Sequence, residues 1–206
     1  MWWPSERLAV VSDLHFEKGS SLASRGLFLP PTETRSTLNR LSAVLSRLEP
    51  QRVIALGDSF HDQGGSSRMA PADQSHLFAL ASHFNWIWVT GNHDPTPPDG
   101  LPGQVVAETC INGLTFRHEA KQAARPGEIS GHFHPKARIK TRAKAITRPC
   151  FIADQTRLIL PAFGALTGGL SVRDPAIARL FTAQAALWLL GQTRITPLPL
   201  SATSRR

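Results

Sequence analysis

Four short motifs of acidic, imidazole and amide residues occur in order along the sequence. They read Asp-x-His, Gly-Asp, Gly-Asn-His-Asp and Gly-His-x-His, and each follows an apolar run. Their polar members are Asp13, His15, Asp58, Asn92, His93, Asp94, His132 and His134. Imidazole combined with carboxylate suits Mn, Fe, Zn and Co ions, whereas an all-oxygen set would suit Mg or Ca. The joint pattern therefore predicts a site for transition-metal ions.

The first three motifs stand where predicted strands end. We expect buried strands over residues 7–13, 52–58 and 86–94, with helices over 30–50 and 71–84 between them. This alternation favours right-handed crossovers and a largely parallel sheet. Ligands bind at the carboxyl ends of such strands, because the loops there converge on one crevice. The motifs should therefore meet at one edge of the sheet.

The second half of the chain reads as a series of short strands. The strand-like runs cover 104–108, 114–118, 127–134, 136–146, 150–154 and 157–163, with a further helix or strand pair in 176–199. We expect these runs to form a second sheet packed on the first. The predicted fold class is α/β, an αββα sandwich of two mixed β-sheets flanked by helices. Residues 1–206 would form a single domain, with a frayed tail from about 201 to 206.

Other histidines fit simpler interpretations. We assign His76 and His83, on the second predicted helix, as solvated or core residues. His118, alone in "RHEA", would by itself be interpreted in the same way. His61 and Asp62 follow Asp58 closely and could orient ligands or face substrate, so they stay outside the predicted metal set.

The motif types suit chemistry on phosphate esters. Two cations about 3.5–4 Å apart clamp a phosphoryl group and lower the pKa of a bridging water. A carboxylate is the natural bridge between them because it has two oxygens. His132 and His134 are two residues apart, which puts both on one face of a strand, or lets them splay onto two ions in a turn.

At these motifs the sequence resembles the calcineurin-like metallophosphoesterases. The resemblance implies two divalent metal ions, Mn2+ first, with Zn2+, Fe2+ or Co2+ as alternatives. It implies that one ion is held by Asp13, His15, Asp58 and His134, and the second by Asp58, Asn92, His118 and His132. His93 would not bind metal. It would protonate the leaving oxygen, with Asp94 or another carboxylate orienting it.

Several longer phrases resemble one branch of that family, the ligase-associated DNA damage response endonucleases of bacteria (PdeM-type). These phrases are "LGDSFHD", "RHEA", "GHFHPKA", "RPCF" and "LPAFGALTGGLSVRDP". The resemblance implies a manganese-dependent phosphodiesterase that acts on DNA in repair. It also implies a DNA ligase, a helicase or an exonuclease of the same repair system as partners.

The charge of the chain favours a polyanionic partner. Net charge is +8 and the sequence pI is about 10.7. Cations alternate with other residues at Lys136, Arg138, Lys140, Arg142 and Lys144. On one strand they would share a face, either as a solvated edge that discourages aggregation or as a binding surface for DNA phosphates. Such contacts read the backbone, so little sequence specificity is expected.

The same composition argues against export and membrane insertion. Two cysteines are too few for a disulfide scaffold, and no signal peptide or long apolar run is visible, so a cytoplasmic protein without a membrane partner is expected.

The leading hypothesis is a DNA phosphodiesterase or endonuclease in which a metal-bridging hydroxide attacks phosphorus in line. One alternative is a phosphodiesterase or pyrophosphatase acting on a small nucleotide or a lipid-linked substrate. Another is a repair-complex adaptor without catalysis.

Overall fold

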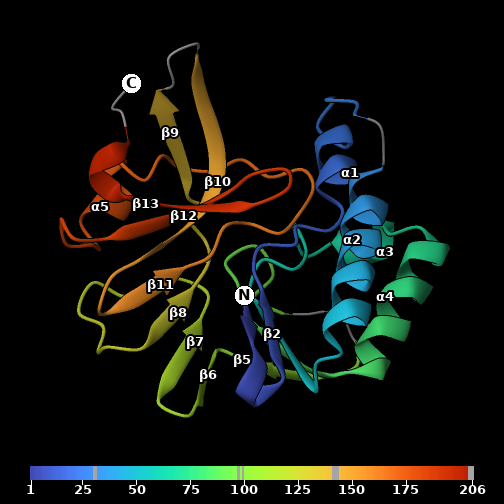
Figure 1. Cartoon of the computed structure of the whole chain (residues 1–206). Helices are drawn as coiled ribbons and strands as arrows, with labels where there is room; N and C mark the ends of the chain where they lie inside the picture. The colour runs from blue at the N-terminus through green and yellow to red at the C-terminus, as the bar shows by residue number, and fades with distance from the viewer. Residues whose placement is uncertain (30–31, 97, 99, 141–143, 204–206) are drawn as a thin grey trace.

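Two sheets lie between helices, with α1 to α4 on one side of the molecule and α5 on the other (Figure 1). The computed structural model describes residues 1–29, 32–96, 98, 100–140 and 144–203. Arg142 of the predicted DNA-binding surface lies outside these described residues. Helices α1 to α4 lie together on one side, and the strands of the C-terminal half lie on the other.

The first sheet has five strands in the order β1-β2-β3-β4-β5. Their bounds are Trp2–Trp3, Leu8–Val11, Arg52–Leu56, Asn85–Val89 and Gln104–Val106. All neighbours pair in parallel except β1, which is antiparallel to β2. This confirms the three predicted buried strands and their parallel arrangement.

Helices make the crossovers from β2 to β3 and from β3 to β4. The long helices are α2 (Glu33–Leu48) and α4 (Pro71–His83), which match the two predicted helices. The short helices α1 (Lys18–Ala23) and α3 (Gly65–Arg68) have no apolar stripe and were not predicted. Two single 3-10 turns cover Pro4–Glu6 and Leu200–Ala202. Within the described residues, none of the helices combines the length and the apolar character that a bilayer crossing needs.

The second sheet is mixed and has eight strands. Its order is β13-β12-β10-β11-β8-β7-β6, and β9 pairs with β10 outside this path. From β6 to β13 the bounds are Glu108–Ile111, Leu114–Arg117, Glu128–Ser130, Lys136–Lys140, Ala145–Ala153, Arg157–Ile159, Ala186–Leu190 and Ile195–Pro199. The helix α5 (Pro175–Ala178) packs at this side of the molecule (Figure 1).

Three apolar clusters join these elements into layers. The first packs α2 and α4 on one face of the first sheet, through residues such as Leu41 and Trp88. The second lies between the two sheets and contains Val10, Ile54 and Phe116. The third packs β10 and β12 against α5 and the loops near it. The layering confirms the predicted αββα class, two mixed sheets flanked by helices.

Three details of the predicted second half were wrong. The run at 104–108 contributes β5 to the first sheet, because it completes the free edge of β4. The single strand expected over 136–146 is instead the hairpin of β9 and β10. The expected fraying from residue 201 does not include Thr203, whose hydroxyl accepts a hydrogen bond from Arg173 Nε at 2.7 Å. Residues 204–206 lie outside the described part of the chain.

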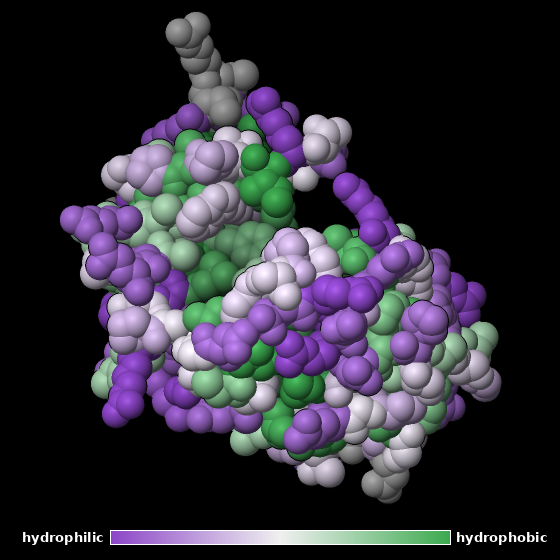
Figure 2. All heavy atoms as spheres, turned by 60° about the horizontal axis from the view of Figure 1, so that its bottom comes forward, coloured by the Kyte–Doolittle hydropathy of each residue, from purple (hydrophilic) through white to green (hydrophobic). Residues whose placement is uncertain are grey.

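Apolar residues also reach the surface. Figure 2 shows one face of the molecule, where an apolar hollow is surrounded by hydrophilic residues. A cavity of about 470 Å³ is lined by residues that include Met1, Phe151, Leu158, Trp188 and Ile195. None of the predicted metal ligands lines this cavity.

The buried ring between the sheets should carry much of the stability. Phe116 has no exposed surface, whereas Phe28 is 83% exposed. We predict that Phe116→Ala lowers the free energy of unfolding by about 3–5 kcal/mol, since it opens a cavity between the sheets. Phe28→Ala makes the same chemical change and should stay within about 0.5 kcal/mol of the wild type. Chemical denaturation measures both, and equal losses would contradict the layered core.

Candidate metal centre

The first ligand group brings together Asp13, His15 and His134. One potential ligand atom from each lies within 4.8 Å of the other two. Nε2 of His134 is 3.1 Å from Asp13 Oδ1 and 3.2 Å from Nε2 of His15. Asp13 and His15 come from the loop after β2, and His134 comes from the loop after β8. Both halves of the chain therefore contribute to this group.

The second group contains Asp58, His118 and His132, and Asn92 lies beside it. Its three ligand atoms also lie within 4.8 Å of one another. Nε2 of His118 is 3.0 Å from His132 Nδ1 and 3.0 Å from Asn92 Oδ1. His118 Nδ1 lies 2.9 Å from the carbonyl oxygen of Leu56, which can only accept, so Nδ1 carries the hydrogen. When the ring is neutral, as metal binding requires, Nε2 therefore offers its lone pair to the group.

Asp58 connects the two groups. Its Oδ2 lies 3.4 Å from His118 Nε2 in the second group and 3.9 Å from His15 Nε2 in the first. Its Oδ1 accepts a hydrogen bond from the backbone N–H of His93 at 2.9 Å. One carboxylate thus contacts both groups and also fixes the residue expected to act as the acid.

Most of these side chains stand on unusual backbone. Positive φ angles occur at Asp13, His15, Asp58, His132 and His134, that is, at five of the six residues in the two groups. Residues other than glycine adopt this conformation rarely, because it crowds Cβ against the backbone. Such strain persists where the surroundings over-determine it, and it concentrates at functional sites. It also explains why His132 and His134 splay, since they lie in a turn beyond β8.

Close packing explains why Gly91 precedes the Asn92-His93-Asp94 run. A Cβ atom at Gly91 would collide with the backbone nitrogen and Oδ1 of Asp58, and would lie 2.8 Å from Asp94 Oδ1. The turns after β3 and β4 can therefore touch only if this position has no side chain.

The pKa values of the cluster shift in opposite directions, because imidazoles and carboxylates are buried close to one another. Burial, and next the neighbouring His134, lower the pKa of His15 to about 2. Burial would also lower the pKa of His118, but its hydrogen bond to Asp58 and the charge of Asp58 raise it to about 9. Burial would raise the pKa of Asp58, yet His118 and the N–H of His93 lower it to about 2. Positive charge is therefore drawn toward Asp58.

The donor set fits two divalent cations. Imidazole nitrogens 3.0–3.2 Å apart, as in His118–His132 and His15–His134, require a shared proton or a cation between lone pairs. Neutral imidazole and ionised carboxylate are the metal-binding forms, and Asp58 and His15 are held in these forms. Mixed N and O donors favour Mn, Fe, Co or Zn ions over Ca.

Asp94 or another carboxylate was expected to orient His93, and the carboxylate that contacts this residue is that of Asp58, whose Oδ1 accepts the backbone N–H of His93. Nδ1 of His93 lies 2.8 Å from the backbone carbonyl oxygen of His61, so a carbonyl rather than a carboxylate holds this ring. The buried carboxylate of Asp94 instead accepts four backbone N–H groups, from Asp58, Ser59, Phe60 and Gly91 at 2.7–3.1 Å. Asp94 therefore builds the turn that presents Asp58.

His61, which was kept outside the predicted metal set as a residue that could orient ligands or face substrate, lies against the site. Its Nδ1 is 3.2 Å from His15 Nδ1, and its ring stacks on His93 with 4.8 Å between centroids. Asp62 points elsewhere and pairs with Arg68 at 2.8 Å. Glu119 was missed, and its Oε1 lies 3.8 Å from His132 Nε2. The short separation of His61 from Asp58 in sequence was the signal for its position.

The remaining histidines fit their simpler interpretation. Nε2 of His76 lies 2.6 Å from Ser42 Oγ between α4 and α2, and the ring of His83 contacts Phe84 edge-on.

The predicted cationic surface is shorter than expected. Strand β9 ends at Lys140, so only Lys136, Arg138 and Lys140 alternate along it. Lys144 immediately precedes β10, which pairs antiparallel with β9. A hairpin forms here because Ala145–Pro149 pair with the whole of β9.

Fold and metal centre together define a class, the metal-dependent phosphoester hydrolases. The sequence profile of the calcineurin-like phosphoesterase family matches residues 6–150, and the chain belongs to this family. No curated protein matches the sequence.

Two solved structures give the comparison. The chain is similar to the Pseudomonas putida nuclease MPE, with 28% identity, 96% of this chain and 90% of that chain covered, and a TM-score of 0.73. It is also similar to the E. coli phosphoesterase Yfce, with 13% identity, coverages of 94% and 98%, and a TM-score of 0.45.

Contact between the turns can be tested at Gly91. We predict that Gly91→Ala lowers the free energy of unfolding by about 1–3 kcal/mol, because the new methyl group overpacks Asp58. Displacement of Asp58 should also reduce bound manganese below the wild-type stoichiometry, as measured by elemental analysis. Gly168→Ala is the matched control, since a Cβ there meets nothing within 4 Å. Wild-type metal content and stability in Gly91→Ala would refute the proposed packing.

Proposed function

We propose that the chain is a phosphodiesterase that cleaves DNA, using a two-metal centre. The observation that carries this proposal is the position of Asp58 Oδ2, within 3.4 Å of one ligand group and 3.9 Å of the other. One oxygen between two ligand groups suits a pair of adjacent cations. Paired cations are the usual means of catalysing in-line displacement at phosphodiesters.

Several observations support DNA as the substrate. The similar Pseudomonas putida protein is called a nuclease, and the similarity to it extends over 96% of this chain. The net charge of +8 favours a polyanion. Strand β9 leaves the loop of His134 and carries cations at Lys136, Arg138 and Lys140. A DNA backbone that passes through the site could continue along this strand.

The metal, the biological role and the protein partners are proposed from the sequence motifs. Manganese as the metal and a role in DNA repair follow from the phrases shared with the ligase-associated branch. A ligase, helicase or exonuclease of the same system would then be a partner. We also propose that residues 1–206 act as a single domain, which the apolar cluster shared by the two sheets supports.

The proposed chemistry divides between cations and side chains. Bound divalent ions would supply charge stabilisation at the phosphoryl oxygens and lower the pKa of an attacking water. Asp58 Oδ1 and the carbonyl of His61 hold His93 from two directions. Since Nδ1 of His93 donates to that carbonyl, Nε2 is the nitrogen that can deliver a proton to the leaving oxygen. Asp94 would act through the backbone turn that fixes Asp58.

Cleavage assays test the substrate. Wild-type protein with Mn2+ should cut DNA, and Asp58→Ala should abolish the activity because both ligand groups lose a shared member. Nucleotides, a nucleoside pyrophosphate and bis-p-nitrophenyl phosphate are compared at the same metal concentration. Rapid turnover of a small diester or pyrophosphate without DNA cleavage would favour a small-substrate hydrolase. No hydrolysis of any of them would favour an adaptor.

The acid can be tested separately from metal binding. We predict that His93→Ala slows hydrolysis by about 10²–10⁴-fold, because the leaving oxygen loses its proton donor. Metal content should stay at the wild-type value, since His93 belongs to neither ligand group. His83→Ala, at the exposed end of α4, is the matched control. Unchanged activity in His93→Ala would reject the proton-transfer role.

A further inference from the structure

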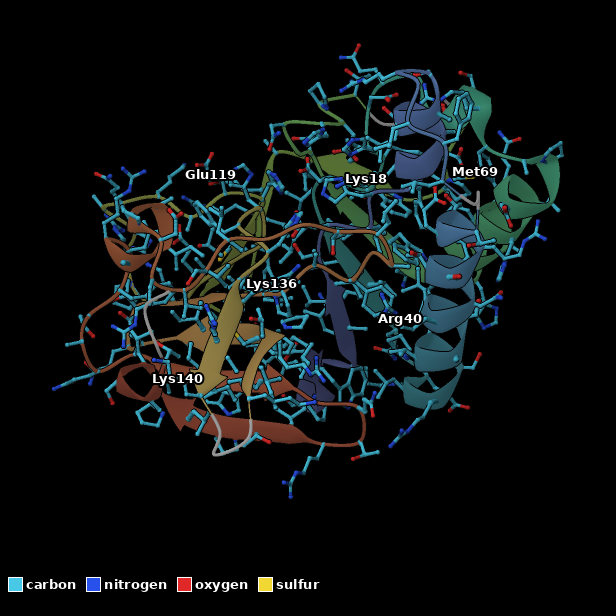
Figure 3. The ribbon with its side chains drawn as sticks, turned by 90° about the horizontal axis from the view of Figure 1, so that it is seen from above. Lys18, Arg40, Met69, Glu119, Lys136 and Lys140 are labelled. Atoms are coloured by element: carbon cyan, nitrogen blue, oxygen red, sulfur yellow. The ribbon has the colours of Figure 1, made fainter. Side chains whose placement is uncertain are left out.

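Two lysines from opposite halves of the chain stand at the first ligand group. Lys18 begins α1, three residues after His15, and Lys136 begins β9, two residues after His134. Both residues are half-buried. Figure 3 shows Lys18 on the side of the helices and Lys136 at the start of β9, across the centre of the molecule.

The two ammonium groups influence each other. Burial, and then the charge of Lys136, lower the pKa of Lys18. Lys18 is therefore close enough to Lys136 for their charges to interact, and it follows the predicted metal ligand His15 by three residues.

Neither lysine has a carboxylate partner among the described residues. Lys18 forms no ion pair within that part of the chain. Within the part of the chain that the structure describes, the Nζ atom of Lys136 contacts the carbonyl oxygen of Thr167, at 3.4 Å, and no carboxylate. Two partly desolvated like charges repel each other, and this cost is relieved when an anion lies between them.

The positive charge continues beyond this pair along the loop 163–167. The guanidinium of Arg40, on α2, lies 4.4 Å from the centre of the Phe163 ring at one end of the loop. Ala165 donates to Thr37 Oγ1 of the same helix, and Thr167 contacts Lys136 at the other end. Arg40 also has no ion-pair partner among the residues that the structure describes.

The opposite side of the centre carries an acid. Glu119 approaches His132 of the second ligand group at 3.8 Å, and its side chain is 61% exposed. A polyanion would be repelled there and attracted to the side of Lys18 and Lys136. The end of the centre at the first ligand group is therefore positively charged, and the end at the second group is negatively charged.

We propose that Lys18 and Lys136 clamp a phosphate group next to the scissile one on the substrate strand, with Arg40 as the following contact. The inference rests on the proposed function and narrows its substrate class. Preferred substrates carry a second phosphate beside the scissile diester, as a polynucleotide does. An isolated diester leaves the clamp empty, and the substrate strand leaves the centre past the first ligand group, away from Glu119.

A ratio of two activities tests the clamp. For each variant, kcat/KM is measured with Mn2+ for a short oligothymidylate and for bis-p-nitrophenyl phosphate, which has no neighbouring phosphate. Lys18→Gln should lower the ratio of oligothymidylate to bis-p-nitrophenyl phosphate activity by about tenfold, the effect of one charged hydrogen bond. The salt dependence of oligothymidylate binding should lose about 0.7 from its logarithmic slope.

The matched control is Lys121→Gln, which removes the same charge from an exposed residue that pairs with Glu108. Its activity ratio should equal that of the wild type. Lys18→Arg keeps the charge and should retain most of the wild-type ratio. It also serves as the second variant if Lys18→Gln does not fold. A ratio that is unchanged in Lys18→Gln, or a substantially lowered ratio in Lys18→Arg, would overturn the clamp.

Failure of the proposed function has a different signature. Wild-type protein that hydrolyses bis-p-nitrophenyl phosphate but leaves oligothymidylate intact would overturn the nuclease proposal, and the clamp with it, before any variant is compared. Wild-type cleavage of oligothymidylate combined with equal losses on both substrates in Lys18→Gln would overturn the clamp alone.

Discussion

The carboxylate of Asp94 ties the turn after β4 to the turn after β3 by accepting three backbone N–H groups there, and it accepts a fourth, from Gly91, within its own turn. Those donors would otherwise be buried without partners, which is costly in a protein interior. Because three of them belong to consecutive residues from Asp58 to Phe60, the bonds fix the direction in which the Asp58 side chain leaves the backbone. The shared position of Asp58 between both ligand groups depends on this arrangement.

The rest of the centre is held by the packing of the two sheets. His118, His132 and His134 come from the second sheet and its loops, while Asp13 and Asp58 follow strands of the first. Left-handed backbone at five ligand positions costs on the order of 1–3 kcal/mol each. The apolar cluster between the sheets, with Val10, Ile54 and Phe116, keeps these strained turns facing one another.

Charge is distributed in a way that serves an anionic substrate. Asp13 and Asp58 are buried with the imidazoles, where cations would neutralise them. Lys18 lies beside that buried cluster and has no carboxylate partner among the described residues, and Arg40 follows on α2 against Phe163. A phosphodiester would therefore meet positive charge at the scissile phosphate and at the adjacent phosphates. The carboxylate of Glu119 would repel the strand from the other side of the centre.

The sequence by itself determined the ligand types, their order and the strands that carry them. This was possible because an apolar run that ends in Asp-x-His, Gly-Asp or Gly-Asn-His-Asp is a local signal, and strand ends in a parallel sheet must meet at one edge. Only the tertiary structure decided that Asp94 serves the backbone and that the His61 carbonyl holds His93. The same holds for β5 joining the first sheet and for Lys18 coming within electrostatic reach of Lys136. Each of these contacts joins residues far apart in the chain, and no local pattern specifies which distant groups will satisfy a buried donor or charge.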